Sequence, residues 1–158
     1  MIFLRASGCR ERGGEDVELN RIDQVAIAVT DLDAAVDFWQ QAFGATLQRR
    51  EVVASDQIEE AMLKVGDGYI QLVAATSDGS TVARFLARSG PGLHHVGFAV
   101  TSLSEALEHL KDLGVRLIDE QPRPGGGGHR VAFVHPKGTG GVLVELVEDD
   151  GHHGEDGS

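Results

Sequence analysis

An internal repeat constrains the fold of this chain more than any other feature of its sequence. IDQVAIAVTDLDAAVDFW, which begins at Ile22, aligns with LHHVGFAVTSLSEALEHL, which begins at Leu93, at a constant offset of 71 residues. Repeats of this period usually mark a duplicated supersecondary unit. Each copy opens with an apolar alternation typical of a β-strand and continues into a helical apolar stripe. The sequence therefore predicts two related modules.

Each helical pattern is followed by further strand-like segments. These segments include residues 59–65 and 69–73 in the first half, and 130–135 and 141–147 in the second. The second helix begins at a capping box, Ser102-Leu103-Ser104-Glu105. An order of strand, helix and about three strands in each half predicts an α+β fold, in which two paired βαβββ modules place their curved sheets around a cavity.

The composition shifts at both ends of the repeat. Residues 1–20 and 149–158 are rich in charge and glycine, which predicts a flexible N-terminal tail and a disordered acidic C-terminal tail. Residues 21–148 form the predicted domain. Within it, module 1 spans about 21–76, a linker helix about 80–90, and module 2 about 91–148.

Charge and cysteine content limit the partners and the compartment. The 158 residues carry 14 Lys and Arg against 25 Asp and Glu, so the net charge of −11 argues against nucleic acid or an anionic membrane as a partner. No window approaches the roughly 20 apolar residues of a membrane span. The single cysteine, Cys9, excludes an intrachain disulfide. A cytoplasmic location is therefore expected.

The two adjacent histidines of PGLHHVGFAV raise the question of which one serves a site. Neighbouring side chains of a strand leave on opposite faces, so His94 and His95 are expected to face different surroundings. His95 shares its face with Gly97 and Ala99, which leave room for a ligand. In the first copy Gln24 takes the place of His95 and is likewise followed by small residues.

The late strands of the two halves repeat this arrangement. Aligning YIQLV with LVELV pairs Gln71 with Glu145, and a carboxylate between apolar neighbours in a strand core requires a counter-charge. A divalent cation would resolve the common burial of four inward polar groups, Gln24, Gln71, His95 and Glu145. Three oxygen donors and one nitrogen donor favour an octahedral ion such as manganese, cobalt, nickel or magnesium. The alternative is a set of unrelated polar residues joined by ordinary hydrogen bonds.

Four segments together resemble a known family. They are IDQVAIAVTDLDAAVDFW, EEAMLKVGDGYIQLV, STVARFLARSGPGLHHVGFAV and GVRLIDEQPRPGGGGHRVAFVHPKGTGGVLVEL, within residues 22–148. The paired modules resemble the vicinal oxygen chelate (glyoxalase/dioxygenase) superfamily, and the segments resemble its methylmalonyl-CoA epimerase family. The resemblance implies an isomerase that interconverts the R and S forms of methylmalonyl-CoA in propionate metabolism and assembles as a homodimer.

The resemblance also implies roles for individual residues. The family's metal ligands fall on Gln24, Gln71, His95 and Glu145, and the family favours cobalt. At the first of these positions the family usually has histidine, so Gln24 is a departure. The acid and base that act at C2 of the substrate are Glu60 and Glu145. Strand alternation leaves only one of Glu59 and Glu60 able to reach the cavity.

A coenzyme A substrate carries phosphates that require cationic partners. Candidates lie around PRPGGGGHR and HPKGTGG, namely Arg123, His129, Arg130 and Lys137. Three alternative functions share the fold. A glyoxalase I type lactoylglutathione lyase tolerates Gln24 but usually has a carboxylate in place of Gln71, and a ring-cleaving dioxygenase normally uses two histidines and one carboxylate. The third is a non-catalytic small-molecule-binding relative.

Overall fold

A computed structural model describes residues 17–150 of the chain, while 1–16 and 151–158, most of both predicted tails, lie outside the described residues. Module 1 consists of β1 (Leu19–Ala28), α1 (Leu32–Phe43), β2 (Thr46–Val53), β3 (Ile58–Val65) and β4 (Gly68–Ala75). Helix α2 (Thr81–Ser89) follows. Module 2 consists of β5 (Gly92–Val100), α3 (Leu103–Asp112), β6 (Arg123–Pro124), β7 (Arg130–Val134) and β8 (Val144–Glu148). The predicted α+β fold with two βαβββ modules is confirmed.

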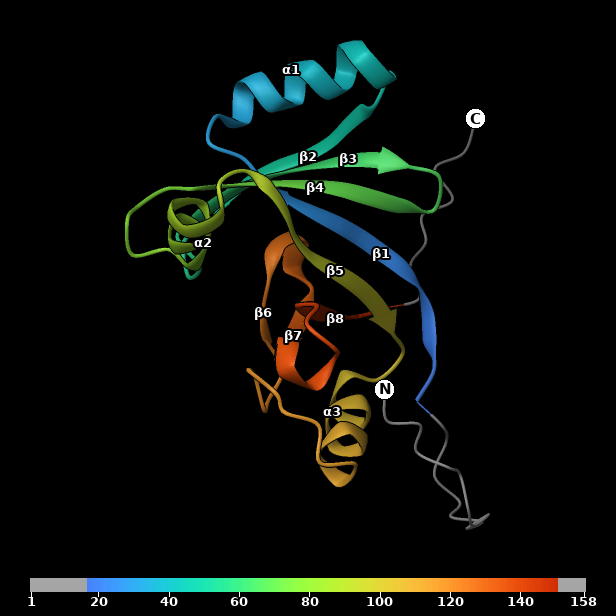
Figure 1. Cartoon of the computed structure of the whole chain (residues 1–158). Coiled ribbons are helices and arrows are strands. Elements are labelled where there is room, and N and C mark those ends of the chain that lie inside the picture. The colour runs from blue at the N-terminus through green and yellow to red at the C-terminus, as the bar shows by residue number, and fades with distance from the viewer. Residues whose placement is uncertain (1–16, 151–158) are drawn as a thin grey trace.

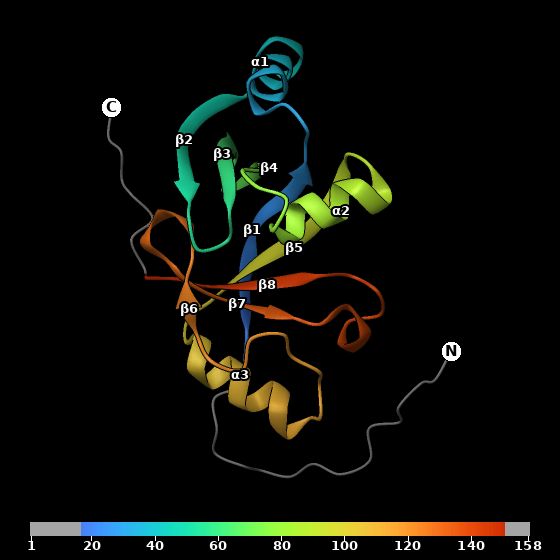
Figure 2. The same ribbon diagram turned by 90° about the vertical axis from the view of Figure 1, so that its left-hand side faces the viewer.

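The strands of both modules form one continuous, strongly curved sheet of eight strands in the order β2-β3-β4-β1-β5-β8-β7-β6. β1 and β5 pair antiparallel at its centre, whereas β1 pairs parallel with β4 and β5 pairs parallel with β8. Figures 1 and 2 show the two halves of the sheet meeting along β1 and β5, with α1 over one half and α3 over the other. The centre of the sheet is therefore where the modules meet.

Local sequence signals explain the helix ends. Asp31 and Ser102 cap the starts of α1 and α3, each by accepting a hydrogen bond from the backbone N–H three residues later. For Ser102 the donor is the N–H of Glu105, as the capping box predicts. Gly44 ends α1 in the left-handed conformation, with a φ of 63°. In contrast, β8 begins three residues later than predicted, because a turn precedes it.

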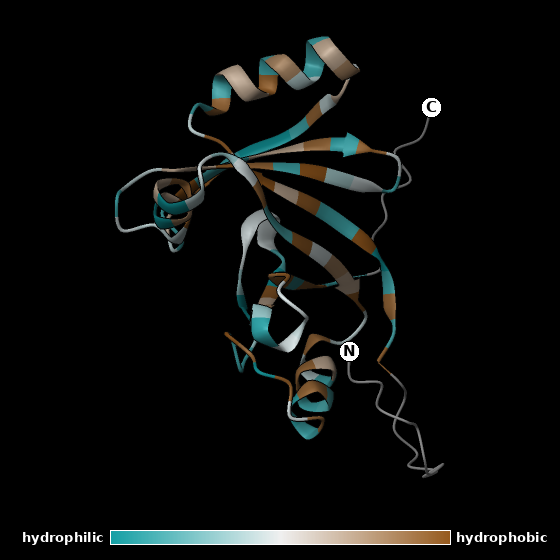
Figure 3. Cartoon of the chain, in the orientation of Figure 1, coloured by the Kyte–Doolittle hydropathy of each residue, from teal (hydrophilic) through white to brown (hydrophobic). Residues whose placement is uncertain are grey.

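Two of the three hydrophobic clusters lie on the outer face of the sheet, under α1 and α3. Leu32 and Val36 of α1 pack with a cluster on β3 and β4, and Leu103 and Leu107 of α3 pack with a cluster on β5, β7 and β8. Figure 3 shows hydrophilic and hydrophobic bands along β1. No helix in the described part of the chain is long and apolar enough to cross a membrane. The inner face carries the polar residues predicted from the repeat, together with a third apolar cluster in which Ile58 and Val73 pack against Val82 of α2.

Candidate active site

The four predicted ligand side chains stand on the four adjacent central strands of the sheet. Gln24 lies on β1, Gln71 on β4, His95 on β5 and Glu145 on β8, and none of them is more than 8% exposed. The strand register places them in two neighbouring rows. Ala26 pairs with both Gln71 and His95. Gly97 pairs with both Gln24 and Glu145.

Gly97 makes room for the amide of Gln24. A Cβ atom built on Gly97 would lie closer than 3.0 Å to the terminal amide atoms of Gln24, a separation that real Cβ atoms essentially never show. The small residue that follows His95 on the inner face therefore leaves the space that the side chain of Gln24 occupies.

Three of these four residues carry a buried polar atom without a hydrogen-bond partner in the described part of the chain. The atoms are Gln24 Oε1, Gln71 Oε1 and His95 Nε2. His95 Nε2 lies 2.9 Å from Glu145 Oε2, but the contact lacks hydrogen-bond geometry. Buried polar atoms normally have a hydrogen-bond partner, so three unpaired atoms on strands close to Glu145 require an explanation.

A divalent cation fits this donor set. Two amide oxygens, one imidazole nitrogen and one carboxylate together supply three oxygens, one nitrogen and a single negative charge, which suits an octahedral ion. Among the described residues, no three His, Cys, Asp or Glu side chains gather in a way that could hold a metal ion. The fit therefore depends on the amides of Gln24 and Gln71.

Glu60 lies beside this set and is held at both oxygens. Its Oε1 accepts a hydrogen bond from Arg49 Nη2 at 2.9 Å, and its Oε2 accepts one from Gln71 Nε2 at 2.6 Å. Because the NH₂ group of Gln71 faces Glu60, the carbonyl oxygen of Gln71 is directed away from Glu60. This oxygen, Oε1, is one of the three buried atoms without a hydrogen-bond partner among the described residues. Gln71 thus links the carboxylate of Glu60 to the candidate cation site.

The surroundings of Glu60 shift its pKa. Burial raises the pKa of Glu60 above its ordinary value of 4.5, while hydrogen bonds from Arg49 and Gln71 lower it. Only 3% of Glu60 is exposed, whereas Glu59 is turned outward and pairs with Arg50 at 2.8 Å. Of the two adjacent glutamates, Glu60 therefore reaches the cavity. A buried carboxylate with a raised pKa suits proton transfer.

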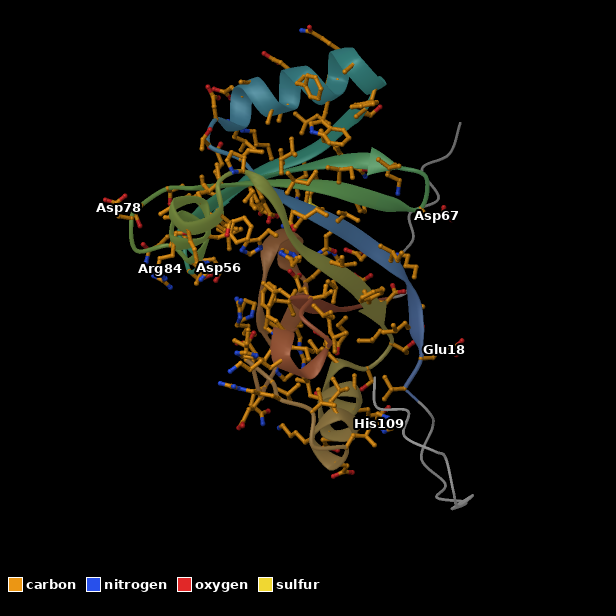
Figure 4. The ribbon with its side chains drawn as sticks, in the orientation of Figure 1. Glu18, Asp56, Asp67, Asp78, Arg84 and His109 are labelled. Atoms are coloured by element: carbon orange, nitrogen blue, oxygen red, sulfur yellow. The ribbon has the colours of Figure 1, made fainter. Side chains whose placement is uncertain are left out.

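Two cavities meet at these residues. The larger has a volume of about 330 Å³ and the smaller about 130 Å³. Both are lined by Glu60, Gln71 and Glu145. Asp56 lines the larger cavity and Asp67 the smaller, and Figure 4 shows these two residues on opposite sides of the molecule. The candidate site is thus approached from two sides.

His94 differs from its expected place. Both His94 and His95 line the larger cavity, and their Nδ1 atoms lie 2.8 Å apart. The pairing of β1 with β5 explains this: Ala26 pairs with His95 and Ile27 with Leu93, so His94 has no partner and forms a β-bulge. A bulge re-aims the side chain of its extra residue. Burial, and secondarily the charge of His95, lower the pKa of His94 to about 4.

The four predicted phosphate-binding residues are not brought together. Arg123 lines the larger cavity, but its guanidinium pairs with Asp56 at 3.1 Å and with Asp119 at 3.2 Å. His129 lines the smaller cavity. Arg130 and Lys137 line neither of these two cavities. His129 and Arg130 are adjacent at the start of β7, where neighbouring side chains diverge.

Sequence reasoning missed Arg49 and the position of His94 in the larger cavity. Arg49 lies on β2, the strand beside β3, and reaches Glu60 across the pair. The alternation of Arg49, Arg50 and Glu51 already indicated that Arg49 and Glu51 share a face. No comparable pattern in the sequence indicated the bulge at His94.

Comparison with known proteins identifies the class. The family model for the Glyoxalase/Bleomycin resistance protein/Dioxygenase superfamily matches residues 23–133, and the chain belongs to this superfamily. An ethylmalonyl-CoA/methylmalonyl-CoA epimerase of Cereibacter sphaeroides is 32% identical over 132 residues, which cover 82% of this chain and 98% of that protein. An uncharacterised Bacillus subtilis protein is 38% identical over 133 residues, covering 84% and 95%.

A solved structure shares the fold closely. A methylmalonyl-CoA epimerase in complex with methylmalonyl-CoA and NH₄⁺ matches with a TM-score of 0.82 and 38% identity, over 84% of this chain and 96% of that one. The predicted resemblance to methylmalonyl-CoA epimerases, which are isomerases, is confirmed. This similarity supports an epimerase function.

Proposed function

We propose that this protein interconverts the two epimers of methylmalonyl-CoA by moving a proton at C2. The observation that carries the proposal is the position of Glu60, a buried carboxylate fixed by Arg49 and Gln71 at the wall shared by both cavities. The similarity to epimerases supports the substrate class, since the solved relative binds methylmalonyl-CoA.

Epimerisation requires a base on one face of C2 and an acid on the other. Glu60 removes the C2 proton of one epimer, and the electron pair of the broken C–H bond moves into the neighbouring carbonyl group to form an enolate. The carboxyl group of Glu145 delivers a proton to the opposite face. The two residues exchange these roles for the other epimer. Glu60 and Glu145 come from different modules, which supports their placement on two sides of one substrate.

Gln24, Gln71, His95 and Glu145 are the residues that would hold a divalent cation. Such an ion supplies positive charge beside the oxygens on which negative charge develops in the enolate. We propose an octahedral ion, with cobalt favoured by the family resemblance. Assembly as a homodimer, a role in propionate metabolism and a cytoplasmic location are further parts of this proposal. Arg123, the cationic candidate in the larger cavity, is proposed to contact the substrate there.

Isotope exchange tests the reaction. One epimer of methylmalonyl-CoA is incubated with cobalt-loaded protein in deuterated water, and deuterium at C2 is measured together with formation of the other epimer. We expect both to appear faster than without protein, and a Glu60→Gln variant to show neither. Metal-loaded protein that accelerates neither process would refute the proposal. Formation of lactoylglutathione from methylglyoxal and glutathione would instead support the glyoxalase I alternative.

A further inference from the structure

The β-bulge at His94 places the imidazole rings of His94 and His95 side by side at the edge of the candidate cation site. His94 Nδ1 and His95 Nδ1 lie 2.8 Å apart, within hydrogen-bond distance. Two ring nitrogens can form a hydrogen bond only if one carries a proton and the other does not. The direction of this hydrogen bond therefore decides whether Nε2, the other ring nitrogen of a neutral His95, carries a proton or a free lone pair.

The far end of the His95 ring faces the candidate site. His95 Nε2 is buried and lies 2.9 Å from Glu145 Oε2 without hydrogen-bond geometry. Two metal ligands, His95 Nε2 and Glu145 Oε2, that both point at the same cation would lie close together in this way without forming a hydrogen bond to each other. For Nε2 to offer its lone pair to a cation, the ring proton must be on Nδ1, which faces His94.

Both rings are held in place by aromatic neighbours. The ring of Phe85, from α2, meets His94 edge to face at 4.9 Å between centroids, and Phe133, from β7, meets His95 at 5.2 Å. The bulge, the two aromatic contacts and the short distance between the Nδ1 atoms together give His94 a defined orientation toward His95.

We propose that His94 is a positioning residue, which accepts a hydrogen bond from the Nδ1–H of His95 and so directs the Nε2 lone pair of His95 at the cation. The inference rests on the cation site of the proposed function. The outer partner of a metal-ligating histidine is usually a carboxylate, a backbone carbonyl or water, and it fixes the tautomer and orientation of the ring. In this chain the partner is a second histidine, itself protonated on Nε2.

Nitrogen NMR of the wild-type protein tests the proposal directly. The full chain is labelled with ¹⁵N-histidine and loaded with Zn²⁺ as a diamagnetic probe. We expect His95 to be protonated on Nδ1 and His94 on Nε2, with a scalar coupling across the hydrogen bond between the two Nδ1 nitrogens. Protonation of His94 on Nδ1 would overturn the proposal. This measurement requires no variant to fold.

Calorimetric titration with Zn²⁺ gives a second readout. His94→Leu removes the acceptor and should weaken binding about 10–100-fold, the usual effect of losing an outer hydrogen-bond partner. His94→Gln, whose amide oxygen can accept, should retain more affinity than His94→Leu. His109→Leu, which removes an exposed histidine from α3, is the control for non-specific binding and should leave the affinity unchanged. Wild-type affinity in His94→Leu would overturn the proposal.

The outcomes separate this inference from the proposed function. A wild-type protein that binds no Zn²⁺ would overturn both the cation site and the role of His94. Bound Zn²⁺ with His94 protonated on Nδ1 would overturn only the role of His94. The expected tautomers in a protein that exchanges no deuterium into methylmalonyl-CoA would support the role of His94 and overturn only the proposed reaction.

Discussion

Substituting Gly97 with alanine should weaken metal binding while changing the free energy of unfolding very little. A Cβ at this position falls within 3.0 Å of the terminal amide of Gln24, so the amide must move by roughly half an ångström or more. Metal–ligand distances in a well-formed site vary by only about 0.2 Å. The displaced Gln24 Oε1 can then no longer reach a cation held by the other three residues.

The cost in folding free energy should be small by comparison. Overpacking a rigid core typically costs about 1–3 kcal/mol, but here the contacted atoms are the far end of a flexible side chain whose Oε1 has no hydrogen-bond partner among the described residues. Replacing glycine with alanine also stabilises by about 0.4–1 kcal/mol through the unfolded state. We therefore expect the free energy of unfolding to change by less than about 1 kcal/mol, while metal affinity falls at least about tenfold.

A double-mutant cycle with Gln24→Ala tests the mechanism. Metal affinity is measured by calorimetric titration and the free energy of unfolding by urea denaturation. Gly97→Ala and Gln24→Ala should weaken metal binding to a similar extent, and the double variant should be no weaker than either, because both remove the same ligand. Additive losses, or wild-type affinity in Gly97→Ala, would show that Gln24 and Gly97 do not act together as described.

Further variants separate the acid–base residue from the ligands. Glu60→Ala retains all four proposed ligands of the cation and should lose about 10²–10⁴-fold in exchange at C2, measured by deuterium incorporation on metal-loaded protein; unchanged exchange would contradict the assignment of Glu60 as a base. For the epimer whose C2 proton Glu60 removes, turnover requires ionised Glu60, so the rate with that epimer falls as pH drops through the raised pKa of Glu60. Arg49→Met removes an influence that lowers this pKa and should move the acidic limb of kcat/KM for that epimer to higher pH, whereas an unmoved limb would argue against the Arg49–Glu60 pair. Gln24→His should keep or strengthen metal binding while His95→Ala and Glu145→Ala weaken it; unchanged metal content in both alanine variants would contradict the ligand set.

Much of the fold follows from short-range patterns in the sequence. The repeat predicts two modules because duplicated sequence produces duplicated local structure, and the Asp31 and Ser102 caps act within one turn of helix. The period-two alternation of β1 and β5 also predicts correctly that Gln24 and His95 are buried. The structure places the four predicted ligands on adjacent strands, and their role as ligands stays a prediction.

The surroundings of the basic residues could not be predicted from the sequence, for a physical reason. Arg123, His129, Arg130 and Lys137 were predicted to bind the phosphates of coenzyme A because they lie around two glycine-rich segments, and this role stays a prediction. Of the four, Arg123 and His129 line the two cavities, and the side chains of neighbouring strand residues such as His129 and Arg130 diverge. Arg123 is also engaged by Asp56 of module 1, which is 67 residues away in the chain. Local patterns in the sequence do not reveal that Arg123 and Asp56 are in contact.

The sequence by itself determined which residues alternate inward, because the period of a strand is a property of the local backbone. Only the tertiary structure decided how strands from different parts of the chain align. Strand pairing brings Arg49 to Glu60, turns the NH₂ group of Gln71 toward Glu60, and creates the bulge that turns His94 toward His95. These features depend on register between strands, and register is set by the packing of the whole sheet.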